Sequence, residues 1–199
     1  MKVIVGISGA SLANLGIKTA NVLNELKCEV CVIFSQNAKI SLACESLNIN
    51  MRTNLSPCEL IKKADQFIAK SLNVQIKVQN EIYHSAASGS SGYDAMLIAP
   101  CSTNALAKIA CGISDNLLTR AAAVMLKERR KLILGVREMP LSPISLKQMS
   151  TLAKLGVIIA PPILASYSDA KNLNEIENFI IGKWLDVLGI QNNLYKRWK

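Results

Sequence analysis

Short apolar segments alternate along the chain with longer segments in which apolar residues recur at helical spacing. The short segments, which predict strands buried on both faces, are 2–7, 29–34, 75–79, 94–99, 131–136 and 157–160. The longer segments, which predict helices, are about 11–26, 36–46, 57–72, 102–111, 116–130, 145–155 and 172–188. This alternation predicts a three-layer α/β/α fold, a Rossmann-like (flavodoxin-like) domain with a mostly parallel six-stranded sheet.

Residues that favour helix ends flank several of these segments. Ser102 is placed to cap the helix that follows it, and Ser56 precedes Pro57, a residue tolerated in the first helical turn. Glycines that can end a helix in a left-handed conformation are Gly112, Gly156 and Gly189. The stretch 85–92, rich in Ser and Gly, is expected to form a flexible loop.

The composition fits one cytoplasmic domain. A chain of 199 residues, 50% of them hydrophobic, is the size that builds one core, so we expect a single domain over 1–199. The N-terminal segment reads as a strand rather than a secretion signal, and no apolar run reaches membrane-spanning length. We therefore expect a cytoplasmic protein that does not enter a membrane.

The charge of the chain favours an anionic partner. Lys and Arg number 23 against 14 Asp and Glu, a formal net charge of +9. This charge does not choose among nucleic acid, a membrane surface and a small phosphate. Aromatic residues make up only 5% and do not alternate with basic ones, so a nucleic-acid surface is not expected.

Cysteine and histidine usage argues against redox and metal chemistry. Cys28 and Cys31 have C-x-x-C spacing, but Cys31 lies inside the apolar run 30–34, so both are interpreted as core thiols. His84 is the only histidine and is interpreted as a loop residue, which weakens any Ser-His-Asp or histidine-metal site. The sequence has no paired-Asp element for magnesium, and no metal is expected.

Polar residues follow the predicted strands at the edge where ligands bind in open α/β sheets. The turn at 6–11 reads Gly-Ile-Ser-Gly-Ala-Ser, and its amides at a helix start suit a phosphate. It is neither G-x-G-x-x-G nor a Walker A sequence, and the second strand ends at Ser35 rather than at the acidic residue that a dinucleotide ribose favours. A mononucleotide such as FMN therefore fits better than NAD.

Two further groups at this edge leave two interpretations open. Ser102, Thr103 and Asn104 can contact a phosphate or a flavin edge, or Ser102 can simply cap the helix. Arg137 and Glu138 follow an apolar strand directly and can belong to a pocket or form a structural ion pair.

Some Lys and Arg side chains near helix ends are expected to be solvated, and others could contact a ligand. The run 127–131, Lys-Glu-Arg-Arg-Lys, stands at a predicted helix C-terminus, where positive charge is favourable. At most one cation of this run needs a ligand, and we assign Arg129, Arg130 and Lys131 to a solvated helix end. Lys183 lies at the edge of the apolar stripe of the last helix and can face a pocket or an interface.

Several longer motifs add to the turn at 5–11. They are Ala87-Ser88-Gly89-Ser90, Pro100-Cys101-Ser102-Thr103, Asp115-Asn116-Leu117-Leu118-Thr119-Arg120-Ala121-Ala122, Leu126-Lys127-Glu128-Arg129-Arg130 and Val136-Arg137-Glu138-Met139-Pro140-Leu141. With these motifs the chain resembles the UbiX-type flavin prenyltransferases nearly from end to end.

The resemblance implies a reaction and partners. The enzyme would join the dimethylallyl group of dimethylallyl monophosphate to N5 of reduced FMN, release phosphate, and close a ring onto C6 without a metal. The prenylated FMN would serve UbiD-type decarboxylases. The chain would assemble with itself into a homo-oligomer, often a dodecamer, with sites at subunit junctions. Its C-terminal helix, 172–188, and the tail would take part in subunit contacts.

The resemblance also implies roles for particular residues. Those that would bind FMN are Gly9, Ala10, Ser11, Ser35, Ser102, Thr103, Asn104, Ala105 and Arg137. Those that would contact the prenyl phosphate are Ser88, Gly89, Ser90, Lys127, Arg137, Tyr167 and Lys183. Those that would act in catalysis, at the flavin's reacting edge or in proton transfer, are Ser11, Glu45 and Glu138.

Some positions depart from the family pattern, and other functions stay open. The departures, which bear on pocket shape and prenyl preference more than on reaction type, are Leu12, Leu15, Ile82 and Ser145. One alternative is an FMN-dependent decarboxylase of cysteine-containing peptides, which would use a His near the first helix, where this chain has none. Another is a flavin carrier without chemistry of its own.

Overall fold

The computed structural model describes residues 1–46, 55–78 and 81–198. The strands are β1 (Lys2–Ile7), β2 (Glu29–Phe34), β3 (Gln75–Val78), β4 (Ala95–Cys101), β5 (Lys131–Val136) and β6 (Ile158–Ile159). The α-helices are α1 (Ala13–Glu25), α2 (Gln36–Ser46), α3 (Pro57–Ser71), α4 (Thr103–Ala110), α5 (Leu117–Lys127), α6 (Pro143–Lys154) and α7 (Leu173–Leu188). Short 3-10 turns are η1 (Ser85–Ala87), η2 (Gly89–Ser91) and η3 (Ser166–Ser168). Position 79, the last of the third predicted strand, lies outside the described residues.

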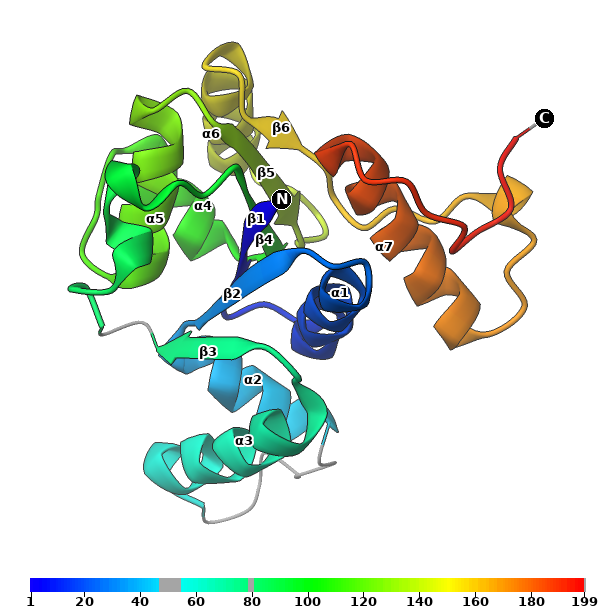
Figure 1. The fold of residues 1–199 in the computed structure, drawn as a ribbon, viewed down its shortest axis with the longest axis horizontal. Helices are drawn as coiled ribbons and strands as arrows, with labels where there is room; N and C mark the ends of the chain where they lie inside the picture. Colours follow the sequence, from blue (N-terminus) through cyan, green and yellow to red (C-terminus); the bar gives the residue numbers. More distant parts are fainter. Residues whose placement is uncertain (47–54, 79–80, 199) are drawn as a thin grey trace.

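The six strands form one parallel sheet in the order β3-β2-β1-β4-β5-β6. This arrangement confirms the predicted α/β fold, and the order is the Rossmann one rather than the 2-1-3-4-5 order of flavodoxin. In the register of the sheet, Val5 of β1 stands opposite Val32 of β2 and Leu97 of β4. The chain passes from β1 to β2 and returns beyond β1 as β4 (Figure 1). The switch point, where ligands bind in such sheets, therefore lies between β1 and β4.

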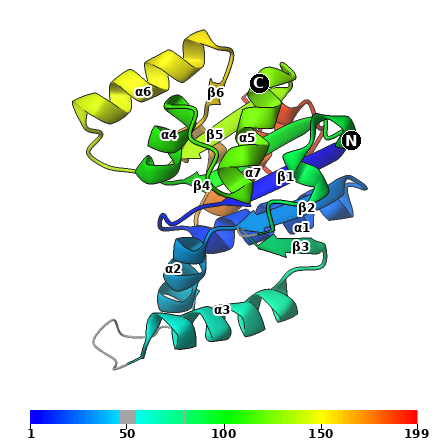
Figure 2. The ribbon, with the colours of Figure 1, turned by 90° about the vertical axis from the view of Figure 1, so that its left-hand side faces the viewer.

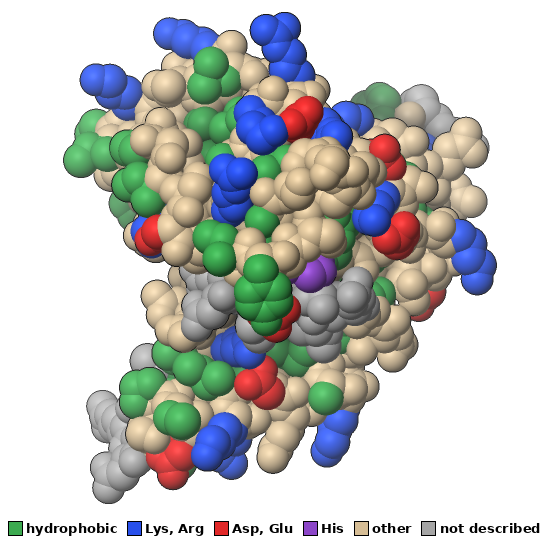
Figure 3. All heavy atoms as spheres, turned by 60° about the vertical axis from the view of Figure 1, so that its left-hand side comes forward, with side chains coloured by type: hydrophobic (Ala, Val, Ile, Leu, Met, Phe, Trp, Pro, Cys, Tyr) green, Lys and Arg blue, Asp and Glu red, His purple; other side chains and the backbone are tan. Residues whose placement is uncertain are grey.

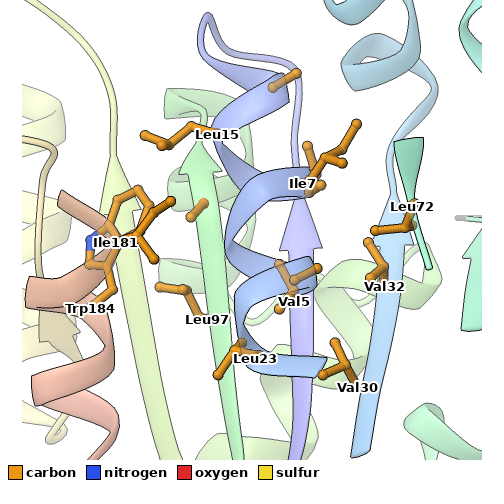
Figure 4. Close-up of a cluster of buried hydrophobic side chains, with 14 of the residues drawn as sticks. Val5, Ile7, Leu15, Leu23, Val30, Val32, Leu72, Leu97, Ile181 and Trp184 are labelled. Carbon is orange, nitrogen blue, oxygen red and sulfur yellow. The ribbon is translucent and has the colours of Figure 1, made fainter. Parts of the chain in front are cut away.

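Alternate residues of β1 face two separate cores. Val5 and Ile7 are fully buried and pack under α1, which contributes Leu15 and Leu23 (Figure 4). Trp184 of α7 belongs to the same core, together with side chains of α2 and α3. This side of the sheet is therefore covered by α1, α2, α3 and α7.

The opposite face carries the second core. Ile4 of β1 and Met96 and Ile98 of β4 are fully buried, and they belong to one cluster with Leu106 of α4 and Leu118 of α5. In Figures 1 and 2 the helices α4, α5 and α6 lie on the side of the sheet away from α1. Burial on both faces explains why the strands read as continuous apolar runs rather than as alternating ones.

Several element boundaries differ from the sequence-based expectation, and three of them have a clear structural cause. Helix α1 begins at Ala13 rather than 11, because Leu12 has φ 77°, a left-handed conformation that a helix cannot include. Strand β4 continues through Pro100 to Cys101, and the ladder to β5 shifts register between Ile98 and Cys101. Helix α6 begins at Pro143 because Ser142 caps it, the same Ser-Pro start that was recognised at Ser56.

The end of α5 corrects part of the assignment of the 127–131 run. The N–H of Arg129 bonds to the carbonyl of Leu126 and that of Arg130 to Met125, a Schellman ending with Arg129 at φ 52°. Arg129 is exposed, as expected. Lys131 is not: its Nζ donates to the carbonyls of Val187 (2.9 Å) and Leu188 (3.1 Å) and holds the end of α7.

Arg130 is a second correction, together with the loop that precedes β4. Its Nη2 donates to the carbonyl of Gly89 at 2.7 Å, so Arg130 is a structural contact rather than a solvated helix end. The stretch 85–92, expected to be a flexible loop, forms the two turns η1 and η2. Its order comes from its own serines, because the Ser91 hydroxyl donates to the carbonyls of Ser85 and Ser88 at 2.6 Å each.

Three global features complete the fold. None of the six cysteines, all of which are described, is in a disulfide, and Cys28 and Cys31 are buried as expected. Among the described helices none combines the length and apolar character needed to cross a membrane. On the face shown in Figure 3, Lys and Arg side chains are spread over several places rather than joined into one basic stripe.

Candidate active site

A cavity of about 240 Å³ lies at the carboxyl ends of the central strands. The residues that line it are Ser8, Gly9, Ser35, Gln36, Asn37, Ser102, Asn104, Ala105, Lys108, Asn116, Leu118 and Thr119. They follow β1, β2 and β4 or belong to the first turns of α2, α4 and α5, apart from Lys108 in the second turn of α4. This is the switch-point position that the strand order predicts for a ligand.

The turn after β1 approaches α2 closely at Gly9. A Cβ placed on Gly9 would lie 2.5 Å from Asn37 Cβ and 3.2 Å from the Asn37 carbonyl carbon, so only glycine fits without movement. Beyond it, the backbone N–H of Leu12 donates to Glu45 Oε2 at 3.0 Å. Glu45, one of the predicted catalytic carboxylates, therefore fixes the same turn that carries Ser11.

Ser8 connects the two turns that form the floor of the cavity. It is 2% exposed, its hydroxyl donates to the carbonyl of Pro100 at 2.9 Å, and its oxygen accepts from the N–H of Ser102 at 2.7 Å. The Ser8 N–H also donates to the Pro100 carbonyl. Ser8 was not among the predicted site residues, although its place directly after the buried strand β1 is a usable signal.

Three helix starts converge on the cavity, and each has a side-chain cap. The oxygen of Ser35 accepts from Ala38 N (3.0 Å), that of Ser102 from Ala105 N (3.2 Å), and that of Asn116 from Thr119 N (3.0 Å). Ser102 is thus an N-cap as predicted, and its hydroxyl hydrogen stays available to a ligand. Helix N-termini carry positive partial charge, so the cavity favours an anion.

Lys108 is the one cation among the residues that line the cavity. Its Nζ lies 2.5 Å from Asp115 Oδ2, and this hydrogen bond lowers the pKa of Asp115. Lys108 was not among the predicted site residues, yet it stands four residues after Asn104 on α4, a spacing that places both on one helix face. Gln36, Asn37, Asn116 and Thr119 were also missed as lining residues.

The sequence-predicted FMN residues divide into two groups. Gly9, Ser35, Ser102, Asn104 and Ala105 line the cavity. Those that the structure does not place among the lining residues are Ala10, Ser11, Thr103 and Arg137.

Arg137 and Glu138 stand beside this edge of the sheet. The backbone N–H of Arg137 donates to the carbonyl of Cys101, which places it next to the end of β4. Arg137 Nη1 lies 4.0 Å from Glu138 Oε1, a loose ion pair, while that oxygen accepts from Met139 N at 3.1 Å. Cys101, which precedes Ser102, is fully buried. Its burial raises the pKa of the Cys101 thiol to about 12, so this thiol is neutral and unreactive.

Lys127 lies near the amino-terminal ends of the strands, opposite the cavity. It ends α5, and β5 then runs six residues before it reaches Arg137. At about 3.3 Å per residue these two cations are separated by roughly 20 Å along the strand. Lys127 forms an ion pair with Glu128, and a Cβ on Gly89 would lie 3.0 Å from Lys127 Nζ. Lys127 and the 88–90 turn are thus together, but away from the cavity.

Tyr167 and Lys183 lie at α7, which contains Lys183 and whose Phe179 packs against Tyr167. The Tyr167 ring packs edge-on against Phe179 and against Trp198 of the tail, with centroids 5.7 and 5.6 Å apart. Lys183 Nζ is 5.9 Å from the Tyr195 ring centroid, and Lys183 lines an apolar cavity of about 230 Å³ with Trp184 and other residues. One chain therefore holds the predicted phosphate-contacting residues in separate places.

Two other expectations concern histidine and metals. His84 begins η1, where its Nδ1 accepts from Ala86 N at 3.2 Å. Within the described ranges, no group of three or more His, Cys, Asp or Glu side chains could hold a metal ion.

Comparisons with known proteins agree on one family. Residues 1–185 match the model of the family described as Flavoprotein. The flavin prenyltransferase UbiX of Campylobacter jejuni is 50% identical over 201 residues, with 100% of this chain and 99% of that protein covered.

Solved structures agree with the sequence match. The crystal structure of AnUbiX (PadA1) in complex with FMN and dimethylallyl pyrophosphate has a TM-score of 0.82 at 32% identity and covers 100% of this chain and 97% of its own. The structure of a dodecameric FMN-dependent UbiX-like decarboxylase from Escherichia coli O157:H7 has a TM-score of 0.83 at 34% identity, with both chains fully covered. The chain belongs to the flavoprotein family and, within it, to the UbiX flavin prenyltransferases.

Proposed function

We propose that this protein transfers the dimethylallyl group of dimethylallyl monophosphate to N5 and C6 of reduced FMN and releases phosphate. Family membership supports the reaction type, and one observation carries the assignment of the flavin to this chain. That observation is the cavity where three capped helix starts meet a turn that only glycine can make at Gly9. The prenylated FMN then passes to a UbiD-type decarboxylase.

The residues of the cavity fit the phosphate end of FMN. Its lining offers amide and hydroxyl donors at helix starts and the ammonium of Lys108, a donor set suited to a dianionic phosphate. Its volume, about 240 Å³, is below the ~300–1,000 Å³ of pockets that enclose a whole ligand of this size. The described residues of one chain therefore enclose only part of FMN.

The distribution of the cations supports a site shared between copies. Phosphate is a poor leaving group unless cations stabilise its developing charge. Lys127 lies away from Arg137 along β5, and Lys183 lines the apolar cavity rather than the polar one, so other copies of the chain would have to complete the set of cations. We therefore propose a homo-oligomer, such as a dodecamer, in which α7 and the C-terminal tail take part in subunit contacts.

Roles follow from the placement of each group. Bound reduced FMN supplies the nucleophilic N5 and C6. Arg137, beside the end of β4, is suited to bridge flavin and phosphate, while Lys127, Lys183 and Tyr167 are suited to hold the phosphate. Glu138 and Glu45 accept and return protons, and Ser11 stands on the turn that Glu45 fixes.

Anaerobic mixing of the purified protein with reduced FMN and dimethylallyl monophosphate tests the function. Mass spectrometry should find flavin carrying one added C5H8 unit, together with released phosphate. Absence of this product would exclude prenyl transfer and leave the flavin carrier. A carrier would also bind FMN without any response to substitution of Lys127 or Lys183.

Arg137→Ala tests the residue assigned to both ligands. Loss of charge-assisted hydrogen bonds, worth roughly 1.5–3 kcal/mol each, should weaken FMN retention and lower turnover together. Wild-type FMN retention and turnover would remove Arg137 from the site.

Co-expression of two variants tests the shared site. Arg137→Ala and Lys127→Met each damage one of the separate places, so mixed oligomers contain some sites with both cations intact. Activity of the mixture should exceed that of either variant alone. If the mixture is no more active than either variant, the two cations of each site come from one chain, and the shared site is wrong.

A further inference from the structure

The 88–90 turn is a compact structure held by its own hydroxyls. Ser88 begins η2, and its Oγ lies 2.9 Å from Ser90 Oγ. The Ser91 hydroxyl also stabilises the turn by donating to the carbonyls of Ser85 and Ser88. These bonds fix the internal shape of the turn, but none of them sets its position relative to Lys127.

Two arginines outside the turn hold it against α5. Arg130 Nη2 donates to the carbonyl of Gly89 at 2.7 Å, and Arg120 Nε donates to that of Ala87 at 3.2 Å. Arg130 is half-buried, and its Nη1 is buried without a hydrogen-bond partner in the described part of the chain. A partly buried guanidinium with an unsatisfied nitrogen is costly, and the hydrogen bond from Nη2 to Gly89 offsets part of that cost.

Gly89 also lies directly against the ion pair at the end of α5. A Cβ on Gly89 would overlap Glu128 Oε1 and would lie 3.0 Å from Lys127 Nζ. Glu128 in turn pairs with Lys127, which lowers the pKa of Glu128. The backbone of the turn and the Lys127 ammonium therefore share one small volume.

We infer that Arg130 is a positioning residue that sets the 88–90 turn against Lys127, so that the turn's donors and the ammonium meet the same phosphate of the prenyl donor. This inference rests on the proposed function. The ending of α5 makes the arrangement possible. The left-handed residue Arg129 reverses the chain, which sends Arg130 toward Gly89 while Arg129 stays exposed.

Arg129 provides a matched control. It is adjacent to Arg130 and carries the same charge, but its side chain is exposed and makes no hydrogen bond or ion pair with the described residues 85–92. Replacing either arginine with Met removes one positive charge and keeps much of the aliphatic stem. The pair separates the effect of the Gly89 contact from the effect of net charge.

Steady-state kinetics tests the functional part. Arg130→Met should raise the KM for dimethylallyl monophosphate about tenfold, the size expected for one charge-assisted hydrogen bond, with FMN affinity unchanged. Arg129→Met should change neither, and Arg130→Lys, which keeps one charged donor, should recover part of the loss. Equal effects of the two Met variants, or an effect on FMN affinity alone, would overturn the inference.

Hydrogen exchange separates this inference from the proposed function. In Arg130→Met, amides of 85–91 should exchange faster than in Arg129→Met, at matched thermal stability. Faster exchange with an unchanged KM would show that the turn does not meet the donor. Unchanged exchange would show that Arg130 does not position it. Failure of the wild-type protein to form prenylated flavin would overturn the proposed function. The exchange result would still show whether Arg130 holds the 88–90 turn in place.

Discussion

The cavity after β1 and the outlying cation sites are built in opposite ways. The cavity is assembled within one chain from backbone amides, short hydroxyl side chains and a glycine, all held by helix caps and by Ser8. Lys127 and Lys183 instead project from helices at other edges of the fold and are exposed. The sheet fixes the positions of the hydroxyl and amide groups at the strand ends. The positions of the long Lys127 and Lys183 side chains depend instead on the surfaces that surround them.

This difference teaches how the two ligands depend on the fold. Binding of the phosphate end of the flavin should depend on the integrity of one chain, because the donors of the cavity are part of its secondary structure. Prenyl-donor binding should follow the exposed cations and the packing of copies. Substitutions in the two regions should therefore affect different binding constants.

Gly9→Ala should produce the largest effect, on the cavity alone. The new Cβ would lie 2.5 Å from Asn37 Cβ, and forced movement of a packed backbone costs about 1–3 kcal/mol. FMN affinity, measured by quenching of flavin fluorescence, should fall about tenfold to a hundredfold. Adding Asn37→Gly should restore part of it, whereas adding Asn37→Ala, which keeps the Cβ, should not. Restoration by both would refute the steric cause.

Lys127→Met and Lys108→Met should separate the two regions. Each removes one cation that the proposed function assigns to a phosphate, a contact worth about tenfold in binding. Lys127→Met should raise the KM for dimethylallyl monophosphate and leave FMN affinity intact. Lys108→Met should lower FMN affinity, because it removes the cation of the cavity and leaves Asp115 without its ion-pair partner. Identical profiles would show that the two regions are not functionally separate.

Asp186→Asn should loosen the tail beside Tyr167 and Lys183 in a pH-dependent way. Burial raises the pKa of Asp186, but hydrogen bonds from Arg197, Tyr195 and Asn192 outweigh it, and the pKa is lowered overall.

A lowered folded-state pKa adds stability above the unfolded pKa of about 3.9, and this stability is lost as the pH falls through the folded value. Urea unfolding should show the variant about 1 kcal/mol less stable at pH 7. Below about pH 4 the difference should shrink. A stability difference between the two proteins that grows as the pH falls would contradict a lowered pKa of Asp186 in the folded state.

Arg129→Gly should produce the smallest effect. Arg129 pays for a left-handed conformation at φ 52° that glycine adopts without strain. The variant should gain about 0.5 kcal/mol in urea unfolding, reduced by the greater freedom of glycine in the unfolded chain. Its KM for the prenyl donor should stay at the wild-type value, which also checks the control used for Arg130.

Sequence reasoning worked best where a signal is local. Burial on both faces gives continuous apolar runs, so the strands were placed well, and the caps Ser56 and Ser102 follow from backbone donors a few residues away. It failed at Leu12 and Arg129, where residues other than glycine adopt a left-handed conformation because surrounding contacts hold them. Propensity favours glycine there, so no local pattern predicts these two positions.

The sequence by itself determined the alternation of strands and helices, the polar turns after the strands and the family. Only the tertiary structure decided which of these groups meet. Ser8 bonds to Ser102 across 94 positions, and Arg130 reaches Gly89 across 41. Such contacts depend on the strand order and on how α5 ends, which are set by packing of the whole chain rather than by nearby residues. For the same reason, the distance between Lys127 and Arg137 became visible only in the folded sheet.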